Sequence, residues 1–130
     1  MEKKKNALIV TDGAGSTQKI AASISAGLEG YQVVTLTASD FSGANILPAD
    51  IIFLGCEKSD PPSFAYISEL LRHINLAGRR FGVFSADSAK TLKYLAGLVK
   101  DSDAALGEPF LAKVEEAGAV KKWVKSVLKS

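Results

Sequence analysis

The chain has 130 residues, of which 47% are hydrophobic and 23% are charged, and its net charge is +2. This length predicts a single domain, residues 1–130. No apolar segment approaches the roughly 18 residues of a membrane span. The basic residues 1–5 are typical of a solvated tail rather than a signal peptide, which indicates a cytoplasmic protein. Lysines gather near both ends without interleaved aromatic residues or a nucleic-acid motif, so we expect neither nucleic acid nor a membrane as a partner.

Short apolar runs and helical patterns alternate along the chain. The runs cover residues 7–10, 33–36, 51–54, 81–84 and 110–114. They lack a clean polar alternation, which is typical of central strands buried on both faces. The apolar residues with helical spacing are Ile20, Ile24 and Leu28; Phe64, Ile67, Leu71 and Ile74; Leu92, Leu95, Ala96 and Val99; and Val120, Trp123, Val124 and Val127.

The order of these patterns predicts the fold class. Strands that alternate with helices form parallel sheets with right-handed crossovers. We therefore expect an α/β domain, a doubly wound five-stranded parallel sheet with helices on both faces. Only the connection 39–48 lacks a long helical pattern, because Gly43 and Pro48 interrupt it, and we expect this crossover to be short or irregular.

The candidate site follows from the fold class, because ligands of doubly wound sheets bind beyond the carboxyl ends of the strands. In the prediction, three loops lie there, at residues 11–17, 55–63 and 85–90. The first loop consists of Thr11, Asp12, Gly13, Ala14, Gly15, Ser16 and Thr17.

The first loop has two interpretations. Glycines and hydroxyl groups ahead of a helix are typical of a phosphate cradle, because backbone N–H groups and the helix dipole favour an anion. Alternatively, Asp12 or Ser16 caps the helix and the glycines serve a tight turn. The loop lacks the third glycine of a dinucleotide fingerprint and the Gly-Lys pair of a Walker loop. Its residues alone leave both interpretations open.

Several stretches together resemble the flavodoxin family. They are "TDGAGSTQKIA" after the first strand, "IIFLGC" with "SDPPSF" at the third, "GRRFGVFSADS" at the fourth, and "GEPF" before a last helix that carries Trp123. The similarity spans nearly the whole chain. It implies a single flavodoxin-like domain that binds FMN and transfers electrons between redox protein partners. The positions that the resemblance assigns to FMN are Thr11, Asp12, Gly13, Ala14, Gly15, Ser16, Thr17, Cys56, Ser59, Asp60, Ser85, Ala86, Asp87 and Lys90.

The first loop departs from the family's phosphate motif, which runs Ser/Thr-x-Thr-Gly-Asn-Thr. Gly15 and Thr17 match this motif, and Ser16 replaces its asparagine. Ala14 and Asp12 stand in place of two hydroxyl residues. The resemblance therefore implies a cradle with fewer side-chain donors.

Asp12 is the most consequential of these departures. A carboxylate about 5 Å from a phosphate repels it by roughly 3 kcal/mol per unit charge at an effective dielectric constant near 20. FMN binding therefore requires that Asp12 point away from the phosphate, or that Lys19 or Lys58 offset its charge.

The surroundings of the flavin ring also differ from the family. Ser59 and Lys90 stand where typical members carry aromatic residues against the ring. Phe64, Tyr66 or Tyr94 would substitute only if the loops follow a different path, and Phe64 belongs to the apolar stripe of a helix. We expect weaker binding and a more exposed flavin, since aromatic stacking contributes on the order of 1 kcal/mol per ring.

Three further residues bear on the chemistry. Asp87 matches the aspartate of the family's Gly-Asp-Ser turn, whose backbone N–H groups face the flavin. Cys56, the single cysteine, fits a small buried residue in a reducing compartment better than a reactive thiol. His73 has no obvious catalytic partner, so we expect an electron carrier without catalytic residues or a metal site of its own.

Other proteins of similar topology fit less well. A phosphoacceptor receiver domain needs an aspartate at the end of the third strand, where this chain has Gly55 and Cys56. The sugar-specific B components of phosphotransferase systems need a cysteine at the end of the first strand, where Thr11 stands. The remaining alternative is a flavodoxin-fold binding or scaffold module that has lost flavin or binds another anionic ligand. The positive net charge of the chain differs from the negative net charge of most flavodoxins, so the redox partners of an electron carrier with this sequence would differ too.

Overall fold

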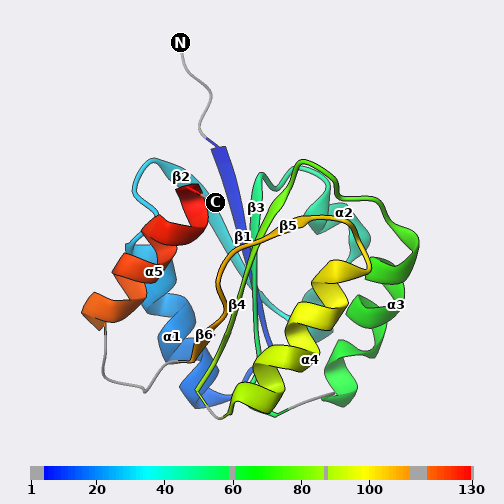
Figure 1. The fold of residues 1–130 in the computed structure, drawn as a ribbon, viewed down its shortest axis with the longest axis horizontal. Helices are drawn as coiled ribbons and strands as arrows, with labels where there is room; N and C mark the ends of the chain where they lie inside the picture. The colour runs from blue at the N-terminus through cyan, green and yellow to red at the C-terminus, as the bar shows by residue number, and fades with distance from the viewer. Residues whose placement is uncertain (1–4, 59–60, 87, 112–116, 130) are drawn as a thin grey trace.

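A parallel sheet with helices on both faces forms the protein, as the computed structural model shows for residues 5–58, 61–86, 88–111 and 117–129 (Figure 1). The strands are β1 (Lys5–Thr11), β2 (Tyr31–Thr37), β3 (Ile51–Gly55), β4 (Arg80–Ser85), β5 (Ala105–Leu106) and β6 (Phe110–Leu111). Their order is β2-β1-β3-β4-β5, β6 also pairs with β4, and every pair is parallel. The predicted fold class is confirmed.

The helices form two layers. They are α1 (Gly15–Ala26), α2 (Gly43–Ile46), α3 (Ala65–His73), α4 (Ala89–Lys100) and α5 (Ala117–Lys129), with 3₁₀ turns at Ala38–Asp40 and Pro62–Phe64. Figure 1 shows α1 and α5 on one face of the sheet and α2, α3 and α4 on the other. The connection after β2 contains only one 3₁₀ turn and the four-residue α2, as its glycine and proline predict. In the part of the chain described here, no helix has the length and apolar character needed to cross a membrane.

Alternate residues of β1 enter two separate cores. Leu8 and Val10 pack in the α3/α4 core, which also contains residues of those two helices. Ala7 and Ile9 pack in the α1/α5 core on the opposite face. Because both faces of β1 are buried, its sequence shows no polar alternation.

Strand β2 differs from the prediction that its apolar run is buried on both faces. It lies at the edge of the sheet, and the side chain of Val34 is 50% exposed. Val34 borders a surface hollow that Ala44 and Pro48 also line, beside the one-turn α2. The short crossover after β2 is too small to cover this face, which explains the exposure.

The fifth strand position is divided into two short pieces. β5 pairs with Arg80 and Phe81, whereas β6 pairs with Phe84 and Ser85. The predicted strand 110–114 is therefore confirmed at Phe110–Leu111, while residues 112–114 lie outside the described part of the chain. The intervening segment "GEP" ends in a proline, which cannot donate to a strand ladder, and this accounts for the interruption.

Gly55 sets the end of β3 directly before the second loop. A Cβ atom at this position would lie 2.2 Å from the Phe84 ring, so glycine lets the ring cover the strand. We expect Gly55→Ala to lower the free energy of unfolding by about 1–3 kcal/mol, as overpacking does in a closed core, measured by urea denaturation. Gly97→Ala on the exposed surface of α4 is the control, because its Cβ would meet no atom within 4 Å. That variant should gain about 0.5–1 kcal/mol; unchanged stability of Gly55→Ala would contradict the close approach of Phe84.

Candidate functional site

The three predicted loops meet at the carboxyl ends of β1, β3 and β4. The Asp12 Oδ2 atom accepts a hydrogen bond from the backbone N–H of Glu57 at 2.8 Å, which joins the first loop to the second. The hydroxyl of Thr91 in α4 donates to the carbonyl oxygen of Glu57 at 3.4 Å, which joins the second loop to the helix that follows the third loop. Glu57 thus lies between the first loop and the first turn of α4.

The first loop is held in shape by its own side chains. The Asp12 Oδ1 atom accepts from the N–H of Ala14 at 3.0 Å, and the Thr11 hydroxyl accepts from the N–H of Gly13 at 3.2 Å. Gln18 in α1 donates to the carbonyl of Gly13 at 3.1 Å. Gly13 has a φ angle of 85°, a left-handed conformation that favours glycine. The loop therefore has a defined path, with the carboxylate of Asp12 turned inward along it.

Helix α1 begins without a side-chain cap. Its N-cap residue is Ala14, which makes no capping hydrogen bond, so the interpretation that Asp12 or Ser16 caps this helix is wrong. The N–H groups of the first helical turn have no partner within the helix, as in any α-helix. A Cβ atom on Gly15 would meet no atom within 4 Å, which leaves open space in front of this turn.

Thr17, in the same turn, carries a buried hydroxyl without a partner. The residue is fully buried, and its Oγ1 atom makes no hydrogen bond to any of the described residues. Leaving a buried hydroxyl unpaired costs roughly 1–3 kcal/mol. An acceptor oxygen would reach this hydroxyl only when the surrounding loop opens, because the Oγ1 atom has no accessible surface.

Glu57 is the site residue that the sequence interpretation missed. The hydroxyl of Ser16 donates to its Oε2 atom at 3.0 Å, so its carboxylate lies against the first turn of α1. Finding it from the sequence would have required knowing that β3 lies next to β1. The first loop contains only one carboxylate in its own sequence, that of Asp12. Glu57 adds a second carboxylate from the neighbouring loop.

A pocket of about 570 Å³ opens between the first two loops. The residues that line it are Asp12, Ala14, Glu57, Lys58, Pro61, Pro62 and Ser63. Its volume is in the range of small-molecule sites. Ser59 and Asp60, assigned to FMN by the resemblance, lie outside the described residues.

The aromatic residues considered as partners of the flavin ring are placed elsewhere. Phe64 is fully buried in the α3/α4 core. The Tyr66 hydroxyl accepts from the N–H of Gly43 at 3.0 Å, and its ring packs 6.0 Å from that of Phe41. Tyr94 packs, partly buried, against the α3/α4 core. None of the described residues that line the pocket is aromatic.

The third loop leads into α4 through a capped start. Ser88 is the N-cap residue, and its hydroxyl accepts from the N–H of Thr91 at 3.3 Å. Ser85 is buried at the end of β4, and Ala86 packs partly buried against the α1/α5 core. Lys90 is exposed on the first turn of α4, and Asp87 lies outside the described residues.

Cys56 is buried and structural in character, as predicted. It is fully buried at the end of β3, and this burial, together with the negative charge of Asp12, raises the pKa of its thiol to about 12. The thiol therefore stays protonated at neutral pH. Across the described residues, no three His, Cys, Asp or Glu side chains converge on a possible metal site.

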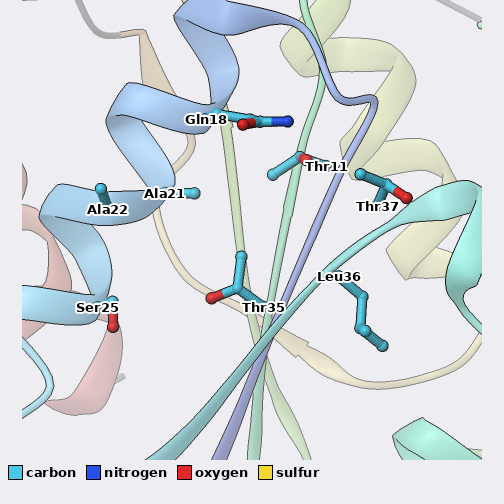
Figure 2. Close-up of a pocket in the computed structure, with 8 residues that line it drawn as sticks. All are labelled: Thr11, Gln18, Ala21, Ala22, Ser25, Thr35, Leu36 and Thr37. Atoms are coloured by element: carbon cyan, nitrogen blue, oxygen red, sulfur yellow. The ribbon is translucent and has the colours of Figure 1, made fainter.

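A second hollow, of about 430 Å³, lies between α1 and the edge strand β2 (Figure 2). Figure 2 shows Gln18 and Thr11 at its upper end, with Thr35 of β2 turned toward α1. Its lining residues carry no charge, and most of them lie along α1 and β2, although Thr11 and Thr37 end their strands. The first pocket, where polar loops and a helix start converge, is therefore the better candidate site.

The fold has clear counterparts among solved structures. A short-chain flavodoxin associated with a non-canonical PDU bacterial microcompartment has a TM-score of 0.86 and 16% identity, over 98% of each chain. A Streptococcus pneumoniae flavodoxin has a TM-score of 0.81 and 18% identity, over 95% of this chain and 97% of that one. A Fusobacterium nucleatum flavodoxin mutant bound to flavin mononucleotide has a TM-score of 0.78 and 12% identity, over 97% and 96%.

No protein-family model and no curated protein matches the sequence. The likeness therefore rests on the backbone: the strand order β2-β1-β3-β4-β5, the two helical layers and the agreement over nearly the full length of the compared chains. On this evidence the chain has the flavodoxin-like α/β fold.

Proposed function

We propose that the protein binds FMN at the candidate site and acts as an electron carrier between redox proteins. The observation that carries this proposal is the start of α1. There the helix has no side-chain cap, and the buried hydroxyl of Thr17 has no acceptor among the described residues. A phosphate group is the ligand that such a set of donors would hold.

The residues beside this turn fit a phosphate in part. Gly15 leaves open space for an approaching ligand, and Thr17 supplies a donor that lacks an acceptor. Asp12, however, does not point away, and no ion pair among the described residues joins it or Glu57 to a lysine. Lys58 lines the same pocket and is the nearest candidate to offset the added charge.

The pocket also supports a place for the flavin ring. Pro61, Pro62 and Ala14 offer apolar surface between the first two loops. Without an aromatic partner among the described lining residues, binding there depends more on the phosphate than on stacking. When bound, FMN supplies a carrier that accepts and releases electrons. The protein contributes the cradle, the pocket and an opening to its surface.

The electron-carrier proposal gives His73 no catalytic role. Its Nε2 atom lies 3.1 Å from Glu69 Oε1 on the exposed surface of α3, and neither residue lines the pocket. We propose a cytoplasmic role, where the single cysteine stays reduced.

A second candidate function is a flavodoxin-fold binding module without flavin. Two observations favour it: the carboxylates of Asp12 and Glu57 occupy donors at the first loop, and the described pocket lining has no aromatic residue. Such a module would act as a binding or scaffold protein without flavin, or would use the same surface for another anionic ligand.

Calorimetric titration of the purified protein with FMN, riboflavin and inorganic phosphate separates the two functions. If the protein is an FMN carrier, FMN binds and riboflavin binds more weakly, because riboflavin lacks the phosphate. Absence of heat and of co-dialysing flavin with FMN in large excess would overturn the proposal and leave the flavin-free module.

A further inference from the structure

The carboxylate of Asp12 already behaves as an anion bound inside the candidate cradle. One oxygen accepts from the N–H of Ala14 at 3.0 Å and the other from the N–H of Glu57 at 2.8 Å. Hydrogen bonds from backbone N–H groups to a carboxylate are among the stronger ones in proteins. The Asp12 side chain thus accepts from two backbone N–H groups that a bound phosphate could otherwise use.

The Glu57 side chain extends the same arrangement onto helix α1. Its Oε2 atom accepts from the hydroxyl of Ser16 at 3.0 Å. The donors left without an acceptor are those deeper in the first turn, including the Thr17 hydroxyl. Carboxylates therefore accept from some of the donors of the cradle, and the Thr17 hydroxyl has no acceptor among the described residues.

From these contacts we propose that Asp12 is an internal competitor for the phosphate of FMN. This inference rests on the proposed function. A phosphate that enters the cradle meets the charge of Asp12, so the Asp12 contacts to Ala14 and Glu57 must open when FMN binds. Loss of these contacts also removes the hydrogen bond from the N–H of Glu57 to Asp12 that joins the first and second loops. The site therefore binds FMN weakly and exchangeably, and it distinguishes FMN from riboflavin less than a cradle without the carboxylate.

Asp12→Ser and Asp12→Asn test this role by calorimetric titration with FMN and riboflavin. Serine restores a short hydroxyl donor, whereas asparagine removes the charge but keeps only one of the two acceptor oxygens, so its NH₂ group faces one of the two N–H groups from which Asp12 accepts. We expect both variants to bind FMN roughly tenfold or more tightly than the wild type, with Asp12→Ser the tighter, because like-charge repulsion is removed. Riboflavin affinity should stay within about twofold, since riboflavin has no phosphate to repel.

Glu57→Gln is the matched control, because it removes a neighbouring charge but keeps the backbone N–H that Asp12 uses. Its gain in FMN affinity should be smaller than that of Asp12→Asn. Circular dichroism of each apoprotein checks that the fold is retained. In the apoprotein, Asp12→Ser should also lower the melting temperature, since the bonds between the two loops are lost.

The possible outcomes separate this inference from the proposed function. If the wild type binds FMN and both Asp12 variants bind it equally or more weakly, the competitor role is overturned while the FMN function stands. If only the variants bind FMN, the competitor role is supported and the FMN function of the natural chain fails. If neither the wild type nor any folded variant binds FMN, both are overturned. An equal gain for FMN and riboflavin would also overturn the competitor role, because the effect would not involve the phosphate.

Discussion

Gly15→Asp is expected to abolish FMN binding while the fold stays intact. A Cβ at Gly15 would meet no atom within 4 Å, so an aspartate fits there and would add a negative charge to the first turn of α1, beside its N–H groups. At about 5 Å and an effective dielectric constant near 20, such a charge lowers phosphate affinity by roughly a hundredfold or more. An acidic residue in the first turn suits the helix dipole, so the melting temperature of the apoprotein should not fall. Calorimetry and thermal unfolding measure the two effects.

Gly15→Ala is the control for this prediction. It adds the same Cβ atom without a charge, and that atom meets nothing within 4 Å. Its FMN affinity should stay close to that of the wild type. Wild-type affinity in Gly15→Asp would show that the phosphate binds elsewhere.

Trp123→Ala should produce the largest loss of stability of any change considered for this chain. The indole stacks on Phe110 with ring centroids 5.1 Å apart, and it meets the rings of Phe53 and Phe84 edge-on at 5.5 and 6.1 Å. Its Nε1 atom donates to the carbonyl of Glu108 at 2.6 Å. Removal leaves a cavity between α5 and the sheet and an unpaired carbonyl, which should cost about 3–5 kcal/mol in the free energy of unfolding. Urea denaturation measures this difference.

Trp123→Phe separates packing from the hydrogen bond. It keeps a ring against Phe110 but loses the donor to Glu108, so its loss of stability should be clearly smaller than that of Trp123→Ala. Equal losses in the two variants would contradict the large packing contribution assigned to the indole.

Much of the fold could be predicted from the sequence, because central strands and helices bear clear patterns. The runs at β1, β3 and β4 are apolar on both faces, and the helical stripes at α1, α4 and α5 mark the faces that the two cores bury. The sheet edges were harder to predict. An apolar run does not reveal whether a helix covers it, so β2 was wrongly interpreted as buried on both faces. The two-residue strand β5 is too short to leave a pattern.

The candidate site was predictable as a set of loops, but its contacts were not. Thr17 and Gly15 could be identified from the order of strand, turn and helix. The inward turn of Asp12 and the place of Glu57 depend on the pairing of β1 with β3, which sets the two loops side by side. Sequence spacing alone carries no information on that pairing.

The measurement that tests the central claim most directly is the change in backbone amide resonances of the ¹⁵N-labelled protein on titration with FMN and with riboflavin. We expect the amides of Gly15, Ser16 and Thr17 to move strongly with FMN, and those of Ala14 and Glu57 to move as they exchange the Asp12 carboxylate for a phosphate. Riboflavin should leave the amides of Gly15, Ser16 and Thr17 nearly unchanged, whereas Ala14 and Glu57 line the pocket for the ring and respond to both ligands. Equal shifts of the Gly15, Ser16 and Thr17 amides with both ligands, or FMN shifts confined to other parts of the chain, would contradict a phosphate cradle at the start of α1.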